Sequence, residues 1–232
     1  MWNSSKICNS LPHMSFDSTS PRWLRFLERK LQWLAIPNIA ILLVTLQVMG
    51  FLMTLMNPIW FYQLALDPRL VLGQGEYWRL ITFLALPLST SPIWILFSLW
   101  FLYFIVNTIE THWGAFRTTL YVLVSILITI AFSLTTLFPI SQATDFESTL
   151  FLAAAMLYPE MEIRLYMAIP VKMKWLAWLS LGYLGFRFFE SPWIYRFYLL
   201  AIYSNFFIFF GPAAIGRIRQ YIRREQFRRR MR

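Results

Sequence analysis

Long apolar segments dominate this sequence and limit what it can fold into. The first of them, Ile36–Met56, holds 21 residues without a single charged side chain. A helix needs roughly 20 mostly apolar residues to cross a lipid bilayer. The whole chain has only 14% charged residues, whereas soluble domains carry about a quarter. The sequence therefore predicts an all-α polytopic membrane protein.

Six membrane-spanning helices are predicted from the apolar runs. They cover Ile36–Met56, Ile93–Thr108, Thr118–Phe138, Phe146–Tyr158, Met173–Phe189 and Trp193–Ile215. Thr82–Leu88 is expected to dip into the membrane before the second span, and the fourth span is short. The connection 57–79 is too long for a turn and is rich in Trp and Tyr, which favours an outer loop lying in the headgroup region.

The basic residues predict the orientation of these spans. Lys and Arg gather in residues 1–35, in the loop after the fourth span and in residues 217–232, whereas Asp145, Glu147 and Glu190 follow the third and fifth spans. Because cytoplasmic loops carry an excess of Lys and Arg, both termini are expected in the cytoplasm. A net charge of +10 in a soluble protein would suggest nucleic acid. In this chain it indicates cytoplasmic loops, and no nucleic-acid partner is expected.

The two ends of the chain flank a membrane domain at residues 36–216. Residues 1–20 lack the apolar core of a signal peptide. From Ser20-Pro21 the 1–35 leader fits either a basic amphipathic helix at the membrane surface or a plain lead-in to the first span. The basic tail, 217–232, either binds anionic lipids or only fixes the topology. Cys8 is either a lipidation site or an inert thiol.

Two motifs beside the second span carry a family resemblance. One is Gly75-Glu-Tyr-Trp78-Arg79, and the other is Glu110-Thr-His-Trp-Gly114, which is followed by Arg117. Their order in a six-span chain resembles the rhomboid family of intramembrane serine proteases. The stretch from Tyr158 to Trp175 also resembles bacterial rhomboid-like proteins and, more distantly, the derlins, which are relatives without protease activity. The resemblance implies a rhomboid-like six-helix bundle over residues 36–216.

The retained positions have structural roles that physical chemistry accounts for. Trp78 and Gly114 belong to the two motifs that define the scaffold. Arg79 can hold the outer loop by donating hydrogen bonds to backbone carbonyls. Glu110, near the other end of the second span, is expected to accept hydrogen bonds from the N–H groups that begin the third span.

The resemblance also permits a test for catalysis, and the required residues are missing. The family's Gly-x-Ser-Gly nucleophile motif aligns with Ser148, but Phe146 and Thr149 replace its glycines. The expected histidine base falls on Ser204 or Asn205. A serine hydroxyl is a weak nucleophile without an adjacent base. The family's two oxyanion donors are replaced as well, by Trp94 and Ser98.

Other histidines do not repair this site. His112 lies at the opposite end of the second span from the start of the fourth, and a base must come within about 2.6–3.2 Å of the nucleophile. His13 lies in the leader. Ser148 is therefore expected to be an N-cap residue of the fourth span, with Asp145 and Glu147 favourable at that positive helix end.

No other chemistry is evident in the sequence. One Cys and two His residues cannot build a usual zinc site, so no metal and no cofactor are expected. Ionisable residues are nearly absent from the predicted spans, which does not favour a transporter. Ser204 and Asn205 stand in a run of Phe. They either form hydrogen bonds between helices or contact a client helix.

These observations favour an integral membrane protein without proteolytic activity, in a bacterial inner (plasma) membrane. By its resemblance to inactive rhomboids, it is expected to bind transmembrane segments of client proteins within the lipid bilayer. One alternative is a protease with a non-standard active site, for which Ser148 is the vestigial candidate. A transporter or channel is the second alternative.

Overall fold

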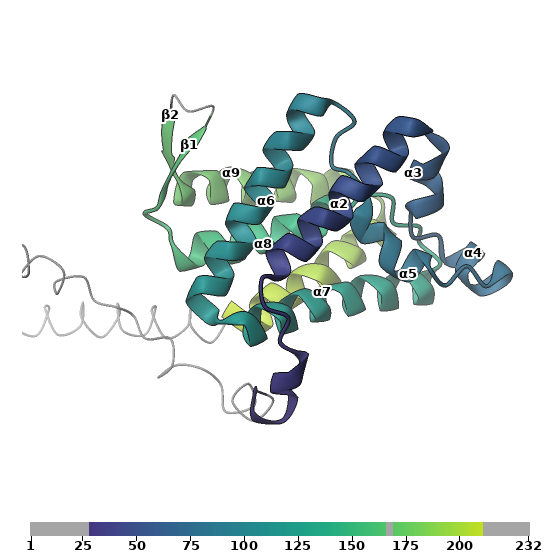
Figure 1. Ribbon diagram of the computed structural model, residues 1–232, viewed down its shortest axis with the longest axis horizontal. Coiled ribbons are helices and arrows are strands. Elements are labelled where there is room, and N and C mark those ends of the chain that lie inside the picture. Colours follow the sequence, from purple (N-terminus) through teal and green to yellow (C-terminus); the bar gives the residue numbers. More distant parts are fainter. Residues whose placement is uncertain (1–27, 166–168, 211–232) are drawn as a thin grey trace, which may run out of the picture.

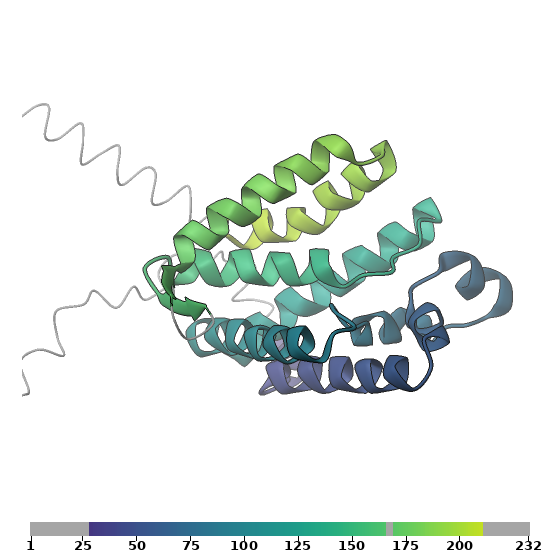
Figure 2. The same ribbon diagram turned by 90° about the horizontal axis from the view of Figure 1, so that it is seen from above.

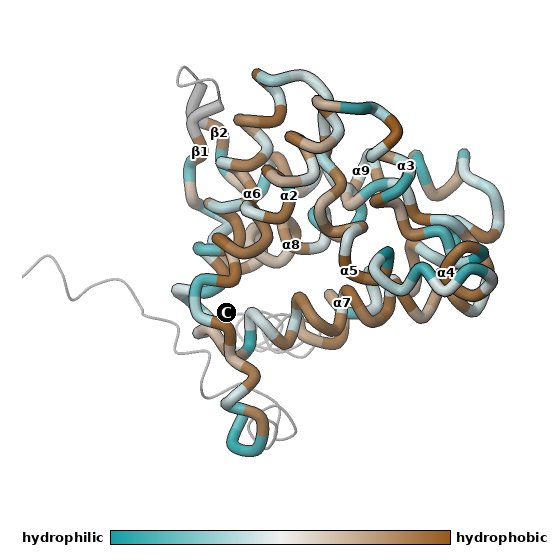
Figure 3. The backbone as a smooth tube through the Cα atoms, turned by 45° about the vertical axis from the view of Figure 1, so that its right-hand side comes forward, coloured by the Kyte–Doolittle hydropathy of each residue, from teal (hydrophilic) through white to brown (hydrophobic). Residues whose placement is uncertain are grey.

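The computed structural model describes residues 28–165 and 169–210, and this part of the chain is mostly helical. By length and composition, four segments can cross a membrane. They are Glu28–Met56, Pro92–Trp113, Ala115–Thr136 and Trp193–Phe210. Figure 3 shows hydrophobic residues along the lengths of the helices in these segments. The prediction of a helical membrane protein is confirmed at this level. The predicted surface helix before residue 28, and the basic tail, lie outside the described residues.

The elements follow one another along the chain with short connections. Their bounds are η3 Gln32–Leu34, α2 Ile39–Met56, α3 Ile59–Leu64, α4 Pro68–Gln74, α5 Arg79–Thr82, η4 Phe83–Ala85, α6 Pro92–Trp113, α7 Ala115–Thr136, α8 Thr144–Leu157, β1 Glu162–Leu165, β2 Ile169–Lys172 and α9 Met173–Glu190. The helix Trp193–Phe210 follows α9 and is called the last helix below.

Four helices form a row, in the order α2, α6, α8 and α9 (Figure 2). The α7 helix packs against α6, and the last helix lies beside α7 and α8 (Figure 1). The segment with α3, α4 and α5 lies at one end of the bundle, and the strands β1 and β2 lie at the other (Figure 2). The α8 helix, with ten of its 14 residues buried, is the central element of the row.

Two of the six predicted spans differ from the other four in length or charge. The α8 helix has 14 residues and is roughly 21 Å long at 1.5 Å per residue, less than the roughly 30 Å of a hydrocarbon core. The α9 helix has 18 residues but carries Lys174, Arg187 and Glu190. Within the residues that the structure describes, helices therefore form at all six predicted places, and four of them can cross a membrane by length and composition.

A small antiparallel hairpin departs from the all-α prediction. Strand β1 pairs with β2, with Glu162 opposite Lys172 and Ile163 opposite Val171. The sequence predicts only a loop between spans at this place, because four-residue strands leave almost no period-2 pattern to detect. The hairpin leads directly into α9, whose first residue Met173 is fully buried.

The outer loop is held tightly against the first span. A Cβ atom at Gly50 in α2 would lie 1.8 Å from the carbonyl oxygen of Ala85 in η4, so only glycine allows this contact. Leu66, after α3, forms an isolated antiparallel bridge with Ile140, which lies between α7 and α8. The segment predicted to dip into the membrane, Thr82–Leu88, is thus packed against α2 at Ala85.

Candidate functional site

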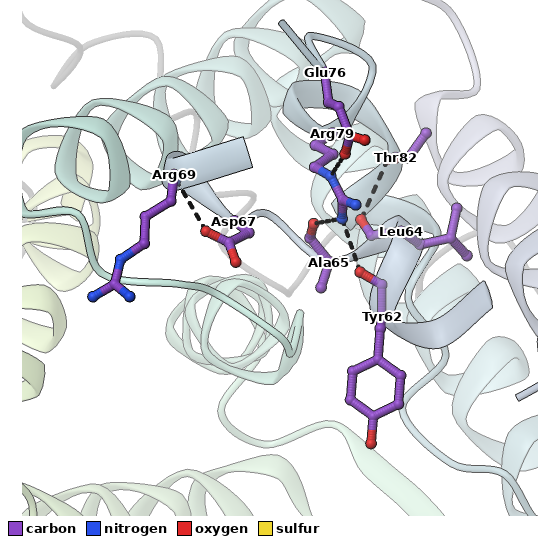
Figure 4. Close-up of polar contacts among 8 residues, drawn as sticks. All are labelled: Tyr62, Leu64, Ala65, Asp67, Arg69, Glu76, Arg79 and Thr82. Atoms are coloured by element: carbon purple, nitrogen blue, oxygen red, sulfur yellow. Dashed lines mark hydrogen bonds and ion pairs between the residues drawn. The ribbon is translucent and has the colours of Figure 1, made fainter. Parts of the chain in front are cut away.

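Arg79 anchors the outer loop through backbone carbonyls, as the sequence predicts. Its Nη1 donates hydrogen bonds to the carbonyl oxygens of Tyr62 at 2.8 Å and Ala65 at 2.9 Å, and its Nε pairs with Glu76 (Figure 4). These carbonyls lie at the C-terminal end of α3, where a helix lacks internal donors. Arg79 is buried, and its hydrogen bonds connect the end of the outer loop to the C-terminal end of α3.

Trp78 stands beside this anchor and remains exposed. It lines a cavity of about 420 Å³ that lies between α2, α3 and α5, together with Glu76, Arg79 and Trp60. Exposed Trp and Tyr side chains in this loop fit the predicted position in the headgroup region. This cavity lies at the loop end of the bundle, away from Ser148.

Glu110 contacts a different helix from the one predicted. Its Oε1 accepts a hydrogen bond of 2.7 Å from the backbone N–H of Asn38, directly before α2, and not from the start of α7. The α6 helix continues past Glu110 to Trp113, and the chain then turns at Gly114, where φ is +83°. This positive φ explains the glycine, and the turn leaves Glu110 facing the first span.

Ser148 lies inside α8 and does not cap it. The helix begins at Thr144 after Ala143, and the Ser148 hydroxyl donates a 2.8 Å hydrogen bond to the Thr144 carbonyl, one turn earlier. The predicted N-cap role is therefore wrong, because the helix starts two residues before the predicted Phe146. Tyr203, from the last helix, is a neighbour of Ser148.

His112 lies far from Ser148. Its Nδ1 is 3.2 Å from the hydroxyl of Tyr158, which directly follows α8. Ser148 is ten residues earlier, roughly 15 Å along the helix axis. Within the described residues, the structure thus brings no imidazole to the Ser148 hydroxyl.

A cavity of about 220 Å³ lies between α6 and α8 and includes Ser148. On α8 its wall is the stripe Thr144, Glu147, Ser148 and Phe151, whose spacing places all four on one helix face. On α6 the wall contains Ser98 among Phe97, Phe101, Leu102 and Ile105. The two positions that the resemblance equates with the nucleophile and an oxyanion donor therefore do line one cavity.

Glu147 is the charged residue of this wall. Its Oε1 accepts a hydrogen bond from Nε2 of Gln47, which is buried in α2. Counted from Ile39, Gln47 is the ninth of the 18 residues of α2, so the carboxylate lies level with the middle of the first span. The sequence prediction placed Glu147 at an outer helix end and missed this contact. The sequence feature that could have indicated this contact is Gln47 itself, an amide residue in an apolar span.

Asp145 occupies a separate cluster, although it is only two residues from Glu147. Its Oδ1 is 3.0 Å from Nη1 of Arg187 in α9, and its Oδ2 accepts a 2.5 Å hydrogen bond from the hydroxyl of Tyr195. The Arg187 guanidinium also lies 5.0 Å from the centre of the Tyr195 ring. This cluster joins α8, α9 and the last helix.

Ser204 and Asn205 do not belong to the cavity. Asn205 is fully buried, and its Nδ2 donates to the Tyr121 carbonyl at 3.0 Å and to the Ser125 hydroxyl at 2.6 Å, both on α7. Ser204 donates to the Ala201 carbonyl of its own helix. Asn205 therefore forms hydrogen bonds between helices, the first of its two expected roles. Its burial keeps a client helix away from it in this packing.

Comparison of the chain with protein-family models, with curated proteins and with solved structures found no match. Within residues 28–165 and 169–210, no three His, Cys, Asp or Glu side chains gather into a group that could hold a metal ion. The cavity between α6 and α8 is the candidate site, because it combines a partly exposed carboxylate with hydroxyls at the level of a span.

Proposed function

We propose that this protein is a non-proteolytic, rhomboid-like membrane protein that binds transmembrane segments of client proteins alongside α6, at the cavity between α6 and α8. The cavity itself is the observation that carries this proposal. The cavity lies on α6, a helix that also exposes large hydrophobic side chains along one face, namely Leu96, Trp100 and Tyr103. Such a face suits contact with apolar chains, whether lipid or a client helix.

The surroundings of Ser148 support a role without proteolysis. Its hydroxyl proton is donated to a backbone carbonyl, and its neighbour from the last helix is Tyr203 rather than a histidine. The residues at the two oxyanion positions fit no better, because Trp94 is largely exposed on α6 and Ser98 donates to the Ile95 carbonyl. An oxyanion needs donors that are aimed at it in advance.

In this proposal all six long helices lie in the membrane, including the short α8 and the charged α9. The charges of α9 stand near its two ends, where Lys and Arg side chains reach the interface. The start of α2 and the end of the last helix lie at the same end of the bundle (Figure 2), as an even number of spans requires. With the positive-inside rule, that end faces the cytoplasm of a bacterial inner membrane.

Site-specific photocrosslinking in native membranes tests client binding. A photoreactive residue at Phe97, in the cavity wall, is expected to form adducts with transmembrane peptides of other proteins. The matched control position is Leu127 on α7, which is exposed but lies outside the cavity. Adducts should be identified by mass spectrometry. Equal yields at Phe97 and Leu127, or adducts with lipid alone, would contradict client binding.

A fluorophosphonate probe tests the absence of proteolysis separately. The purified protein is expected to show no labelling at Ser148, because a hydroxyl without an adjacent base reacts poorly. Labelling that disappears in Ser148→Ala would instead establish the alternative of a protease with a non-standard site.

A further inference from the structure

We infer that the cavity selects client segments that carry a lysine or arginine near the middle of the membrane, with Glu147 as the counter-charge. The inference rests on the proposed function, because it states which transmembrane segments that same cavity binds. Four observations carry it, and they concern charge, hydrogen bonding, size and depth.

Glu147 has no ionic partner within residues 28–165 and 169–210. Its hydrogen-bond partner is the neutral amide of Gln47. A carboxylate at membrane depth is costly unless a cation or several donors satisfy it. The cavity therefore has a vacant place for positive charge.

Apart from the Gln47 amide N–H that donates to Glu147, three polar atoms near the carboxylate are acceptors. The hydroxyls of Ser98 and Ser148 donate hydrogen bonds to the carbonyls of Ile95 and Thr144. Each hydroxyl oxygen can therefore only accept a further hydrogen bond. The Oε1 atom of Gln47 is buried and, within the described residues, has no hydrogen-bond partner. An ammonium or guanidinium group brings several donors and no acceptor, which complements this set.

The size and lining of the cavity suit one long side chain. Its 220 Å³ is far more than the roughly 10–15 Å³ that one water needs, and less than the roughly 300–1,000 Å³ of small-molecule pockets. The remaining wall is apolar and aromatic, with Phe97, Phe101 and Phe151. Lys and Arg place their methylene stems on such surfaces, and their charged groups are attracted to aromatic faces.

The depth of Glu147 sets where the client's basic residue must lie. Because the carboxylate contacts the middle of α2, a client helix that runs alongside α6 presents its central residues to it. A lysine there is costly in lipid alone, and Glu147 is costly when unpaired. Pairing lowers both penalties, so the interaction favours segments that are poorly stable in the bilayer by themselves.

The test uses the full-length protein in phosphatidylcholine vesicles and synthetic transmembrane peptides as probes. Each peptide has about 20 Leu and Ala residues with Lys, Gln, Leu or Glu at its centre, and binding is measured by energy transfer. We expect the Lys peptide to bind about tenfold more tightly than the Leu peptide, since a charge-assisted hydrogen bond is gained, and the Glu peptide to bind most weakly. This order in the wild-type protein requires no variant.

Two variants then assign the preference to Glu147. In Glu147→Gln the ratio between Lys and Leu peptides should fall to about one, whereas in Glu160→Gln, which changes an exposed carboxylate on the hairpin side, it should stay unchanged. Should Glu147→Gln not fold, the peptide order in the wild-type protein decides alone.

The possible failures are distinguishable. If all four peptides bind equally, the inference is wrong and the proposed function stands. If no peptide binds, both are wrong. A proton flux into the vesicles that depends on Glu147, without any preference for the Lys peptide, would overturn the inference in favour of transport.

Discussion

Asp145 and Glu147 are two carboxylates on the same helix whose surroundings differ completely. Two residues correspond to about 200° of rotation in a helix, so the side chains leave α8 on nearly opposite faces. Asp145 meets a guanidinium and a tyrosine hydroxyl and thereby joins α8 to α9 and the last helix. Glu147 meets a single neutral amide and a cavity. One charge is satisfied within the chain, and the other leaves room for a ligand.

The difference shows how a charge in a membrane protein can be interpreted. Both residues stand in the first turn of α8, where a helix favours negative charge, and this explains why either is tolerated. The helix dipole does not distinguish between them. Their partners distinguish them. The ion pair of Asp145 with Arg187 and its hydrogen bond from Tyr195 give Asp145 a structural role. A carboxyl group with only an amide partner keeps hydrogen-bonding capacity that the described part of the fold does not use.

Replacing Asp145 should have the largest effect on stability. In Asp145→Asn the Arg187 guanidinium loses its counter-charge, and Tyr195 loses a charged acceptor. We expect a loss of about 3 kcal/mol in the free energy of unfolding, at the low end for a broken buried pair because Arg187 stays partly exposed. Unfolding in bicelles, followed by Trp fluorescence, measures this. A loss no larger than that of Glu160→Gln would show that the cluster is not a structural joint.

The sequence could predict part of this picture, and the residues show why. The role of Arg79 was predictable because its acceptors at Tyr62 and Ala65 lie within 17 positions, in the same loop. The partner of Glu110 was not, because two helix starts, α2 and α7, compete at that end of the bundle. The favourable effect of a negative charge at a helix start predicted a contact with α7, which follows Glu110 in the sequence. The turn at Gly114 instead leaves Glu110 facing the start of α2.

The candidate site was the least predictable part. Gln47 and Glu147 are 100 positions apart, and no local pattern connects an amide in one span with a carboxylate at the start of another. The resemblance did bring Ser98 and Ser148 to notice, and both line the cavity. It also drew attention to Asn205, which is buried against α7. The resemblance thus pointed to two positions that line the cavity, but it did not predict which side chains surround them.

Replacing Glu147 should have a much smaller effect on stability, which sharpens the comparison. Glu147→Gln removes a carboxyl group that has no ionic partner among the described residues, and it keeps an amide oxygen that can accept from Gln47. The free energy of unfolding should change by less than about 1 kcal/mol, because an uncompensated charge stabilises little or nothing when buried. The same bicelle measurement applies. A loss as large as that of Asp145→Asn would mean that Glu147 is a structural residue, and the contrast would fail.

A third carboxylate, Glu160, gives the exposed limit of the series and the smallest effect. It lies after α8, and Lys174 at 2.6 Å and Lys172 at 2.9 Å donate to it, which lowers its pKa to about 2. A carboxylate whose pKa is lower in the folded state stabilises the fold above its unfolded pKa, and this contribution is lost as the pH falls from about 5 toward 2. Exposed pairs contribute little, so the change in stability should be small beside that of Asp145→Asn.

Carboxyl NMR of the full chain should show Glu160 titrating near pH 2, and Lys174→Met should move the titration upward. A titration already in the ordinary glutamate range in the wild-type protein would show that solvent screens this pair entirely.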